Sequence, residues 1–314
     1  MTTAYITHPS TEQHKISENH PECPERIWAI HDALIGSRLM DLLLPITAAP
    51  AQRAQLELAH GKDYVDFIFA AQPTADQPVQ IDPDTAMNTH TLEAALHAAG
   101  AVALAVDKVM AGEINNAFCA VRPPGHHAER NRGMGFCIFN SIAVGAYQAL
   151  EKHQLSRVAI VDFDVHHGNG SEDIFQDEAR VLFCSSYQHP FYPYSGGANV
   201  ENRRLNIPLT SGTASQQFRE AYEQHCFPTL EAFKPELILI SAGFDAHTAD
   251  PLASLCLDEA DFAWVTAQLM QIAAKNADGK IVSSLEGGYE LGALGRSAAA
   301  HVKELLGAAA KPSE

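Results

Sequence analysis

The segment 158–170 reads VAIVDFDVHHGNG, and it decides both the fold and the chemistry expected of this chain. Its first four residues are apolar and largely β-branched, which predicts a short buried strand. Asp164 and His166 follow at a spacing of two, so both side chains leave the same face where the strand ends. A carboxylate and an imidazole on one face suit a divalent metal such as zinc. A polar loop that only capped the next helix would need one short polar side chain, and this stretch has four metal-competent ones.

Short apolar runs alternate with longer helix-favouring stretches along the rest of the chain. Such alternation predicts a parallel sheet with helices on both faces. No internal repeat or clear linker interrupts it, so residues 1–314 are expected to form a single α/β domain with an open, mostly parallel sheet. Residues 72–83 are polar and contain proline, which predicts a loop. Strands are expected near 117–121, 158–162, 181–185, 236–241 and 280–285, and helices near 25–44, 91–112, 140–152, 215–233, 258–276 and 291–306.

Each notable cluster of polar or aromatic side chains follows one of the expected strands. In open α/β sheets, ligands bind in the crevice beyond the carboxyl ends of the strands. The clusters are therefore expected to meet at one edge of the sheet. Their members are His126, His127, Asp162, Asp164, His166, Phe191, Tyr192, Asp245 and Tyr289.

Composition narrows the classes of function. The 314 residues are 46% hydrophobic and 19% charged, which is enough apolar material for a large core. The net charge of −17 disfavours nucleic acid as a partner, because phosphate backbones would be repelled. The six cysteines form no CxxC pair, no signal peptide is evident, and no apolar run reaches the ~20 residues of a membrane span. We therefore expect a cytoplasmic protein with reduced cysteines and no membrane partner.

Three of the clustered residues have the chemistry of a catalytic metal centre. A catalytic zinc ion typically has three protein ligands and one open position. Asp164, His166 and Asp245 would supply the three ligands. Asp245 alone could equally be the N-cap of a helix, and the metal interpretation is favoured because all three residues follow strands of one sheet.

The other clustered residues suit acid–base catalysis and substrate binding. His126 and His127 are candidates for the general base and acid. Tyr289 could donate its phenol to an oxyanion, although a single tyrosine is most often simply packed. Phe136 and Tyr192 could wall a narrow channel, although Phe136 could also belong to the core. With a metal ion, this set would form a metal-assisted amide or ester hydrolase.

Four ordered motifs strongly resemble the histone deacetylase family, above all its class II branch and bacterial amidohydrolase relatives. The resemblance covers nearly the whole chain and includes an early segment, HPECPER at 20–26. It implies an arginase-like α/β fold and zinc-dependent hydrolysis of N-acyl-lysine. The motifs are RPPGHH at 122–127, DFDVHHGNG at 162–170, AGFD at 242–245 and LEGGY at 285–289.

The resemblance also implies a role for each motif residue. Asp164, His166 and Asp245 would hold one zinc ion. Four other motif residues would take part in acid–base catalysis or polarise the carbonyl. His127 would be the general base and acid, His126 its electrostatic partner, Asp162 the residue that orients His126, and Tyr289 the group that polarises the acyl carbonyl.

One motif position points to the class II branch. Asn169 stands where class I members carry a second Asp, and a neutral partner would leave His127 more readily neutral. His167 is expected to point away, towards the opposite face. Family members also bind a structural potassium ion through backbone near this motif, and Ser185 and Phe175 fall at corresponding positions.

Four residues are expected to bind the substrate: Gly135, Phe136, Tyr192 and Leu252. Leu252 follows the Asp-Pro pair 250–251, where polyamine-deacetylating relatives carry an acidic residue. An apolar rim does not select a dicationic amine. The expected substrate is therefore an acyl-lysine peptide or protein, or a similar small N-acyl amine.

Three alternatives stay open. Binuclear manganese ureohydrolases share the fold, but Gly168 and His247 stand where their pattern has Asp, so a single ion is favoured. A catalytically weak acyl-lysine-binding relative would have lost a ligand, a histidine or the tyrosine, and all are present. An acetylpolyamine or small-ester hydrolase of the same fold is not excluded. Acyl length, zinc versus iron and the oligomeric state, a homo-oligomer included, are also left open by the sequence.

Overall fold

Eight parallel strands form the central sheet of the computed structural model, which describes residues 2–307. The strand order is β2-β1-β5-β10-β9-β6-β7-β8, and a separate antiparallel hairpin is formed by β3 and β4. Residue 1 and residues 308–314, the ends of the expected domain, lie outside the described residues. The strands are β1 (Thr3–Thr7), β2 (Leu44–Thr47), β3 (Val79–Asp82), β4 (Thr85–Met87), β5 (Asn116–Cys119), β6 (Val158–Asp162), β7 (Val181–Gln188), β8 (Arg204–Leu209), β9 (Leu237–Ala242) and β10 (Ile281–Leu285).

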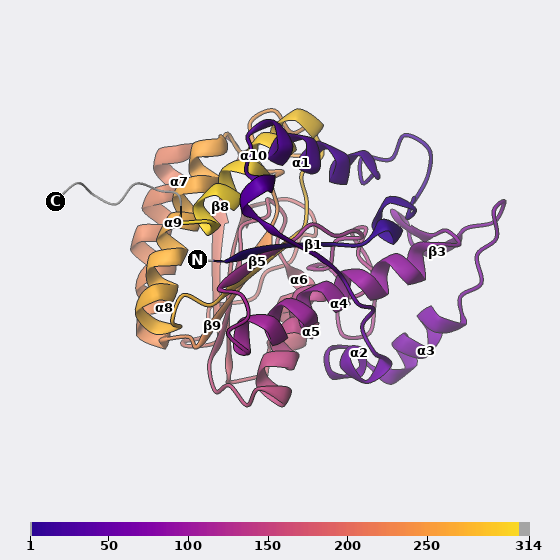
Figure 1. Ribbon diagram of the computed structural model, residues 1–314, viewed down its shortest axis with the longest axis horizontal. Helices are drawn as coiled ribbons and strands as arrows, with labels where there is room; N and C mark the ends of the chain where they lie inside the picture. The colour runs from indigo at the N-terminus through magenta and orange to yellow at the C-terminus, as the bar shows by residue number, and fades with distance from the viewer. Residues whose placement is uncertain (1, 308–314) are drawn as a thin grey trace.

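Helices cover both faces of this sheet, as the alternating sequence pattern predicted. Figure 1 shows α1 and α7 to α10 on one side and α2 to α5 on the other. The α-helices are α1 (Glu25–Gly36), α2 (Arg53–Ala59), α3 (Lys62–Ala70), α4 (Thr91–Met110), α5 (Ser141–Tyr147), α6 (Asn169–Phe175), α7 (Ser215–Ala221), α8 (Phe227–Phe233), α9 (Glu259–Asn276) and α10 (Leu291–Leu305). Short 3-10 turns are η1 (Pro9–Glu12) and η2 (Met40–Leu42), and π-helical turns are η3 (Gln148–Lys152) and η4 (Tyr222–Cys226).

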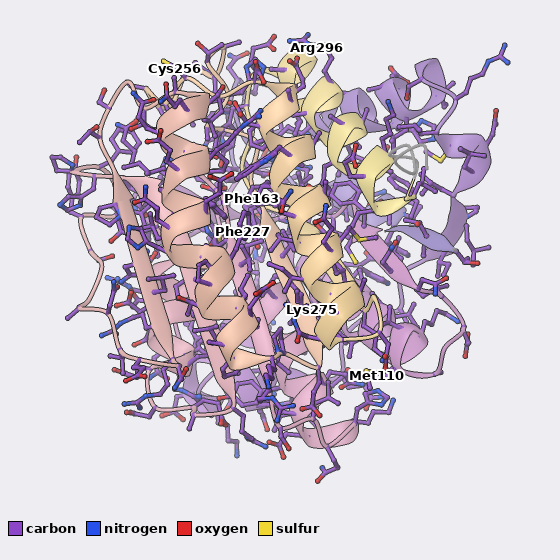
Figure 2. All side chains as sticks on the ribbon, turned by 90° about the vertical axis from the view of Figure 1, so that its left-hand side faces the viewer. Met110, Phe163, Phe227, Cys256, Lys275 and Arg296 are labelled. Carbon is purple, nitrogen blue, oxygen red and sulfur yellow. The ribbon has the colours of Figure 1, made fainter. Side chains whose placement is uncertain are left out.

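Strand β6 shows how the sheet divides the core into two layers. Ala159 and Val161 pack with the α9 and α10 side, whereas Val158 and Ile160 pack with the α4 and α5 side. All four are completely buried, which is why the run is apolar at every position rather than at alternate ones. Phe163 continues into the first layer, behind the helices that lie side by side in Figure 2.

The prediction of a helix over 25–44 is wrong about where the helix ends. Helix α1 stops at Gly36, and Arg38 adopts a left-handed conformation with φ of 58°. The amide of Leu39 then bonds to the carbonyl of Leu34 over 2.9 Å, which closes the helix end. The chain continues through η2 into β2, so Leu44 belongs to an edge strand rather than to a helix.

Several elements were not predicted from the sequence. The structure adds elements to the expected pattern: strands β1, β2 and β8, the hairpin strands β3 and β4, and helices α2 and α3. Strand β3 occupies part of the segment 72–83 that was expected to be a loop. The predicted fold class, a single α/β domain with a parallel sheet flanked by helices, is confirmed. Within the described residues, no helix combines the length and apolarity that crossing a membrane requires.

Candidate active site

The candidate site lies at the carboxyl ends of four adjacent strands, β5, β10, β9 and β6. Each of these strands ends directly before one of the motifs. Because the strands are parallel and neighbouring, their ends meet at one edge, and the residues that follow them come together as predicted.

Asp164, His166 and Asp245 form a buried cluster that can hold a metal ion. Nδ1 of His166 lies 3.1 Å from Oδ1 of Asp164 and 3.1 Å from Oδ2 of Asp245, and one ligand atom from each residue lies within 4.8 Å of the others. The spare carboxylate oxygens are oriented by backbone amides: Gly287 donates to Asp164 over 2.8 Å and Val165 donates to Asp245 over 2.9 Å. This donor set fits a single divalent cation of the zinc type.

The electrostatics of the cluster also call for a cation. Burial and the neighbouring Asp164 raise the pKa of Asp245 to about 7. Burial alone would lower the pKa of His166, but the two carboxylates outweigh it and raise that pKa to about 10. Two ionised carboxylates that are buried side by side are unfavourable unless a positive charge lies next to them, and a divalent ion would supply that charge.

Gly287 is required by the close packing of the two carboxylates. A Cβ atom at this position would overlap with carboxylate oxygens of both Asp245 and Asp164. The glycine of the LEGGY motif thus makes room for the two carboxylates of the candidate metal cluster, which follow two other strands; the sequence alone did not reveal this contact.

The two adjacent histidines have different partners and opposite charge preferences. Nδ1 of His126 lies 2.9 Å from Asp162, and Nδ1 of His127 lies 2.7 Å from Oδ1 of Asn169. Burial lowers the pKa of His126, but Asp164 and Asp162 outweigh it and raise that pKa well above its usual value. The pKa of His127 is lowered, first by burial and then by His126 and the metal-cluster histidine. The site therefore pairs a charged imidazole with a neutral one.

Tyr289 is positioned by groups that the sequence reasoning did not single out. The guanidinium of Arg26 lies 5.0 Å from the Tyr289 ring and donates to the carbonyl of Gly288 over 2.6 Å. Asp250 accepts from the Tyr289 amide over 2.6 Å. Burial, and then the charge of Asp245, raise the pKa of Tyr289 well above its usual value. Tyr289 is therefore a neutral phenol that can donate a hydrogen bond.

Glu286 ties the LEGGY loop to the loop that carries the histidine pair. Its carboxylate accepts from the amides of Gly125 over 2.6 Å and His126 over 3.1 Å, and from Ser241 Oγ over 3.2 Å. Burial raises its pKa to about 7. The glutamate was part of a quoted motif, but its role depends on contacts between strands that a linear sequence does not show.

A second buried network anchors the same region from the N-terminal loop. Arg26 and Arg122 each donate a hydrogen bond from the guanidinium group to the carboxylate of Glu22. Arg122 also donates to the carbonyl oxygens of Thr11 and His14. Both arginines are fully buried. Their charged side chains hold carbonyl oxygens of irregular loops in place, which gives the rim of the site a rigid frame.

Aromatic residues contact the histidines and Tyr289 of the candidate site. Tyr192 lies edge-on to His127 with ring centroids 5.3 Å apart, and Phe191 stacks on His166 at 5.5 Å. Phe136 lies edge-on to both Tyr289, at 5.9 Å, and His20, at 4.6 Å.

Two further predicted substrate residues lie next to the site. Gly135 has a φ of 55°, and a Cβ atom there would overlap with the ring of His127. Leu252 is half-buried and donates its amide to Asp250 over 3.0 Å, so it is attached to the same carboxylate that holds the Tyr289 amide. His167, in contrast, turns away from the cluster: its ring lies 3.2 Å from Ser185 Oγ and 2.8 Å from Glu172.

Comparisons with known proteins agree with this geometry. A family model described as the histone deacetylase domain matches residues 20–305. Histone deacetylase 10, chloroplastic, of Oryza sativa subsp. japonica is 37% identical over 328 residues, covering 96% of this chain and 73% of the rice protein. Polyamine deacetylase HDAC10 of Mus musculus is 35% identical over 334 residues, covering 98% of this chain and 48% of the mouse protein. The crystal structure of the HDA15 HD domain has a TM-score of 0.90 at 32% identity, covering 99% of this chain and 91% of that one. This chain therefore belongs to the histone deacetylase family and is a hydrolase that acts on amides.

Proposed function

We propose that this chain is a deacetylase with a single catalytic divalent ion, which removes acyl groups from N-acyl-lysine or a similar linear amide. The observation that carries the proposal is the meeting of the Asp164–His166–Asp245 cluster with a neutral imidazole, His127, and a neutral phenol, Tyr289. Metal ligands, a base and a hydrogen-bond donor in one buried site are the parts that amide hydrolysis requires.

The ion, when bound, would polarise the acyl carbonyl and lower the pKa of the attacking water. Zinc fits the two carboxylates and one imidazole, and the same donors would accept ferrous iron. The protein contributes the fixed ligand geometry, because backbone amides and glycine positions leave the two carboxylates little freedom.

His127 would carry the proton through the reaction. Its Nδ1–H donates to Asn169, which leaves the Nε2 lone pair to take a proton from the attacking water. The water oxygen forms a bond to the acyl carbon, and Tyr289 donates a hydrogen bond to the oxygen on which negative charge develops. The C–N bond then breaks, and the proton passes from His127 to the leaving amine. His126 lies between Asp162 and Asp164, whose carboxylates favour its protonated form.

Leu252 supports acyl-lysine over a polyamine as the substrate. An apolar side chain beside the Tyr289 loop offers no partner for a second ammonium group, which would have to lose its hydration on entering. The mouse relative named a polyamine deacetylase shows that polyamine chemistry exists within the family. A small-ester substrate would use the same groups.

A single ion is favoured over a binuclear centre. His247 stands where a second-metal ligand would be needed, and it is turned towards Glu259, with 3.5 Å between Nε2 and the carboxylate. Gly168 offers no side chain at the other required position. A structural potassium ion near the Asp162 loop is part of the proposal on the family resemblance alone; Ser185, one of the positions concerned, is the register partner of Asp162 across β6 and β7.

The deciding experiment is an assay of the purified, zinc-loaded protein on acyl-lysine peptides of several acyl lengths, on N-acetylated polyamines and on small esters. His127→Ala should lower kcat by about 10²- to 10⁴-fold, and Tyr289→Phe by about 10²- to 10³-fold, while zinc content is unchanged. A zinc-loaded protein without amide hydrolysis on any of these substrates would refute the proposal. Equal rates for the wild-type protein and both variants would refute the assigned roles.

A further inference from the structure

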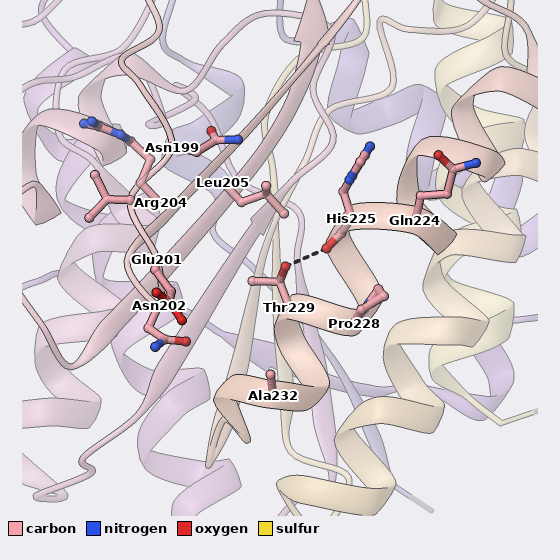
Figure 3. Close-up of a pocket in the computed structure, with 11 residues that line it drawn as sticks. Asn199, Glu201, Asn202, Arg204, Leu205, Gln224, His225, Pro228, Thr229 and Ala232 are labelled. Atoms are coloured by element: carbon pink, nitrogen blue, oxygen red, sulfur yellow. Dashed lines mark hydrogen bonds between the residues drawn. The ribbon is translucent and has the colours of Figure 1, made fainter.

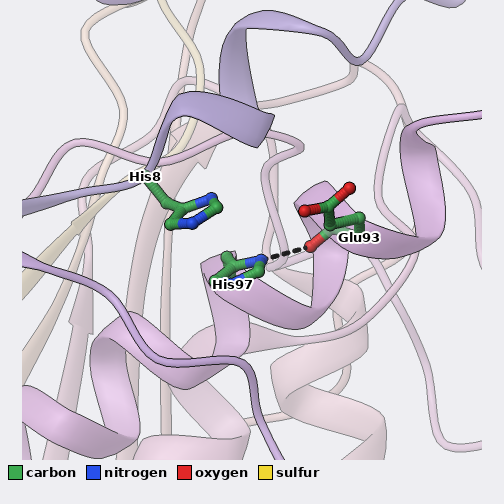
Figure 4. Close-up of side chains that lie close together, drawn as sticks. All are labelled: His8, Glu93 and His97. Atoms are coloured by element: carbon green, nitrogen blue, oxygen red, sulfur yellow. Dashed lines mark hydrogen bonds between the residues drawn. The ribbon is translucent and has the colours of Figure 1, made fainter.

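A second group of metal-competent side chains lies outside the active site. His8 follows strand β1, and Glu93 and His97 lie one turn apart near the start of helix α4. Figure 4 shows the two imidazole rings face to face beside Glu93. Their centroids are 3.5 Å apart with planes 3° from parallel, and one ligand atom from each of the three residues lies within 4.8 Å of the others.

The hydrogen bonds of the two rings leave a free lone pair on His97, whereas Nδ1 of His8 is held by Ser10. Nδ1 of His97 donates to the carbonyl of Glu93 over 2.8 Å, so its Nε2 keeps a lone pair. Nδ1 of His8 accepts from the Ser10 amide over 3.1 Å and lies 2.7 Å from Ser10 Oγ, so this nitrogen is occupied and the neutral ring carries its proton on Nε2. His97 therefore has the arrangement common in metal-binding histidines, in which the second ring nitrogen donates to a carbonyl oxygen.

The donor chemistry decides which ion would bind. Two imidazoles and one carboxylate suit borderline divalent transition metals, whereas Mg²⁺ and Ca²⁺ prefer sites built only from oxygen. Glu93 is exposed and His8 is half-buried, so an ion could reach the group from solvent and complete its coordination with water. We propose that His8, Glu93 and His97 form a second, solvent-accessible site for a divalent transition metal such as Zn²⁺ or Ni²⁺.

Binding includes a rotation of one ring. Parallel lone pairs 3.5 Å apart do not converge on one ion at the ~2.1 Å that a Zn–N bond requires. His97 is buried and held by its bond to the helix carbonyl, whereas His8 sits in an extended backbone conformation at the edge of η1. The His8 ring is therefore the one that turns towards the ion, and this turn releases its Nδ1 from the amide and hydroxyl of Ser10.

The ion would fasten the N-terminal loop to helix α4. This loop already contacts the helix start, where His14 Nδ1 lies 2.8 Å from Thr91 Oγ1. Carbonyl oxygens of Thr11 and His14 in the same loop accept from Arg122, which precedes the catalytic histidine loop. An ion shared by β1 and α4 adds a link to this frame, and it stabilises the folded chain in proportion to its occupancy.

The test uses the holoprotein with its active-site ion in place and excess metal removed. Zn²⁺, and separately Ni²⁺, is added while binding is followed by calorimetry and Tm by scanning fluorimetry. The wild-type chain should bind one further ion, and its Tm should rise with metal concentration. His97→Ala should lose both effects, and Glu93→Gln should weaken binding at least about tenfold.

The control variant removes an exposed histidine elsewhere on the surface. His225 lies on η4 at a surface pocket of 360 Å³ (Figure 3), and it belongs to no group of ligands in the described part of the chain. His225→Ala should keep both the extra ion and the metal-dependent rise in Tm. The proposal is overturned if the wild-type protein binds no further ion, or if His97→Ala binds it as tightly as wild type. A His97→Ala variant whose Tm is lower but still rises with metal as in wild type would also overturn the proposal. In that case, the stacked rings of His8 and His97 only stabilise the fold and bind no metal.

Discussion

His127 donates its Nδ1–H to Asn169 over 2.7 Å, and Asn169 in turn donates its amide nitrogen to Glu129 over 2.8 Å. The ring is thus oriented by a neutral side chain. Its pKa is lowered mainly by burial, then by the neighbouring histidines, and the bond to Asn169 opposes this shift. A lowered pKa of His127 agrees with the neutral imidazole predicted from Asn169, but burial is its main cause.

Replacing this neutral partner by a charged one should move the pH profile. In Asn169→Asp, a carboxylate next to Nδ1 stabilises the protonated ring and raises the pKa of His127 by about one unit or more. The base must be neutral to act, so the acidic limb of kcat/KM should move to higher pH by the same amount. Rates measured between pH 5 and 9 would show this, with the exposed Asn202→Asp as the control. An acidic limb that stays in place would show that His127 is not the titrating base.

Gly287→Ala should damage the metal site without touching a ligand. The added methyl group would overlap with the carboxylates of Asp164 and Asp245, so the two ligands must move apart. We expect metal affinity to fall at least about tenfold, with activity falling in parallel. Metal content after dialysis against a weak chelator measures the effect. Gly36→Ala is the matched control, because no atom lies within 4 Å of its added Cβ. Full metal retention by Gly287→Ala would contradict the assignment of this site.

The sequence could place the candidate site residues together because they lie after the ends of neighbouring strands. Asp164 and His166 could be placed on one face from spacing alone, and parallel strands bring Asp245 and Tyr289 to the same edge. Arg26 could not be placed in the same way, since its partners are carbonyl groups some 260 positions later in the chain. Every residue has a backbone carbonyl, so the residue type does not show which carbonyl will accept a hydrogen bond from a distant side chain.

The missed elements have similarly local causes. Strand β2 is four residues long, mostly exposed and contains Pro45, so it lacks the apolar run that marks a buried strand. The predicted helix reached Leu44 because Leu42 continues the apolar face of the helix, although its side chain is exposed. The pair His8 and His97 was missed because the two residues are 89 positions apart and belong to no spaced motif.

Leu252→Glu should raise kcat/KM on acetylspermidine-type substrates. The position is joined through Asp250 to the Tyr289 loop, so a carboxylate there would lie near the substrate entrance and could pair with a distal ammonium group. A gain of about tenfold is expected, with a loss on neutral acyl-lysine peptides. Leu252→Gln is the control, because it matches the size of glutamate without its charge. No gain for Leu252→Glu, or an equal gain for Leu252→Gln, would count against charge selection at this rim.

His301 should make folding stability depend on pH between about 3 and 6.5. It is fully buried between Thr266 Oγ1, at 2.6 Å, and Ser283 Oγ, at 2.8 Å, and burial lowers its pKa to about 3. The unfolded chain takes up a proton near pH 6.5 whereas the folded chain does not, so stability falls as pH drops through that value. Between pH 7 and 5.5, one such histidine should cost about 1 kcal/mol, or about 2 °C in Tm.

A variant isolates this contribution from those of other buried groups. His301→Gln has no titrating group at the position, so its Tm should fall less than that of wild type over the same pH interval. His60, whose pKa burial lowers to about 4, keeps its own contribution in both proteins and serves as the internal reference. The comparison uses the difference between two pH values within each protein, so a general loss of stability in the variant cancels. Equal falls in Tm for the two proteins would mean that His301 takes up its proton at the same pH in the folded and unfolded chains, which its burial against two hydroxyl groups argues against.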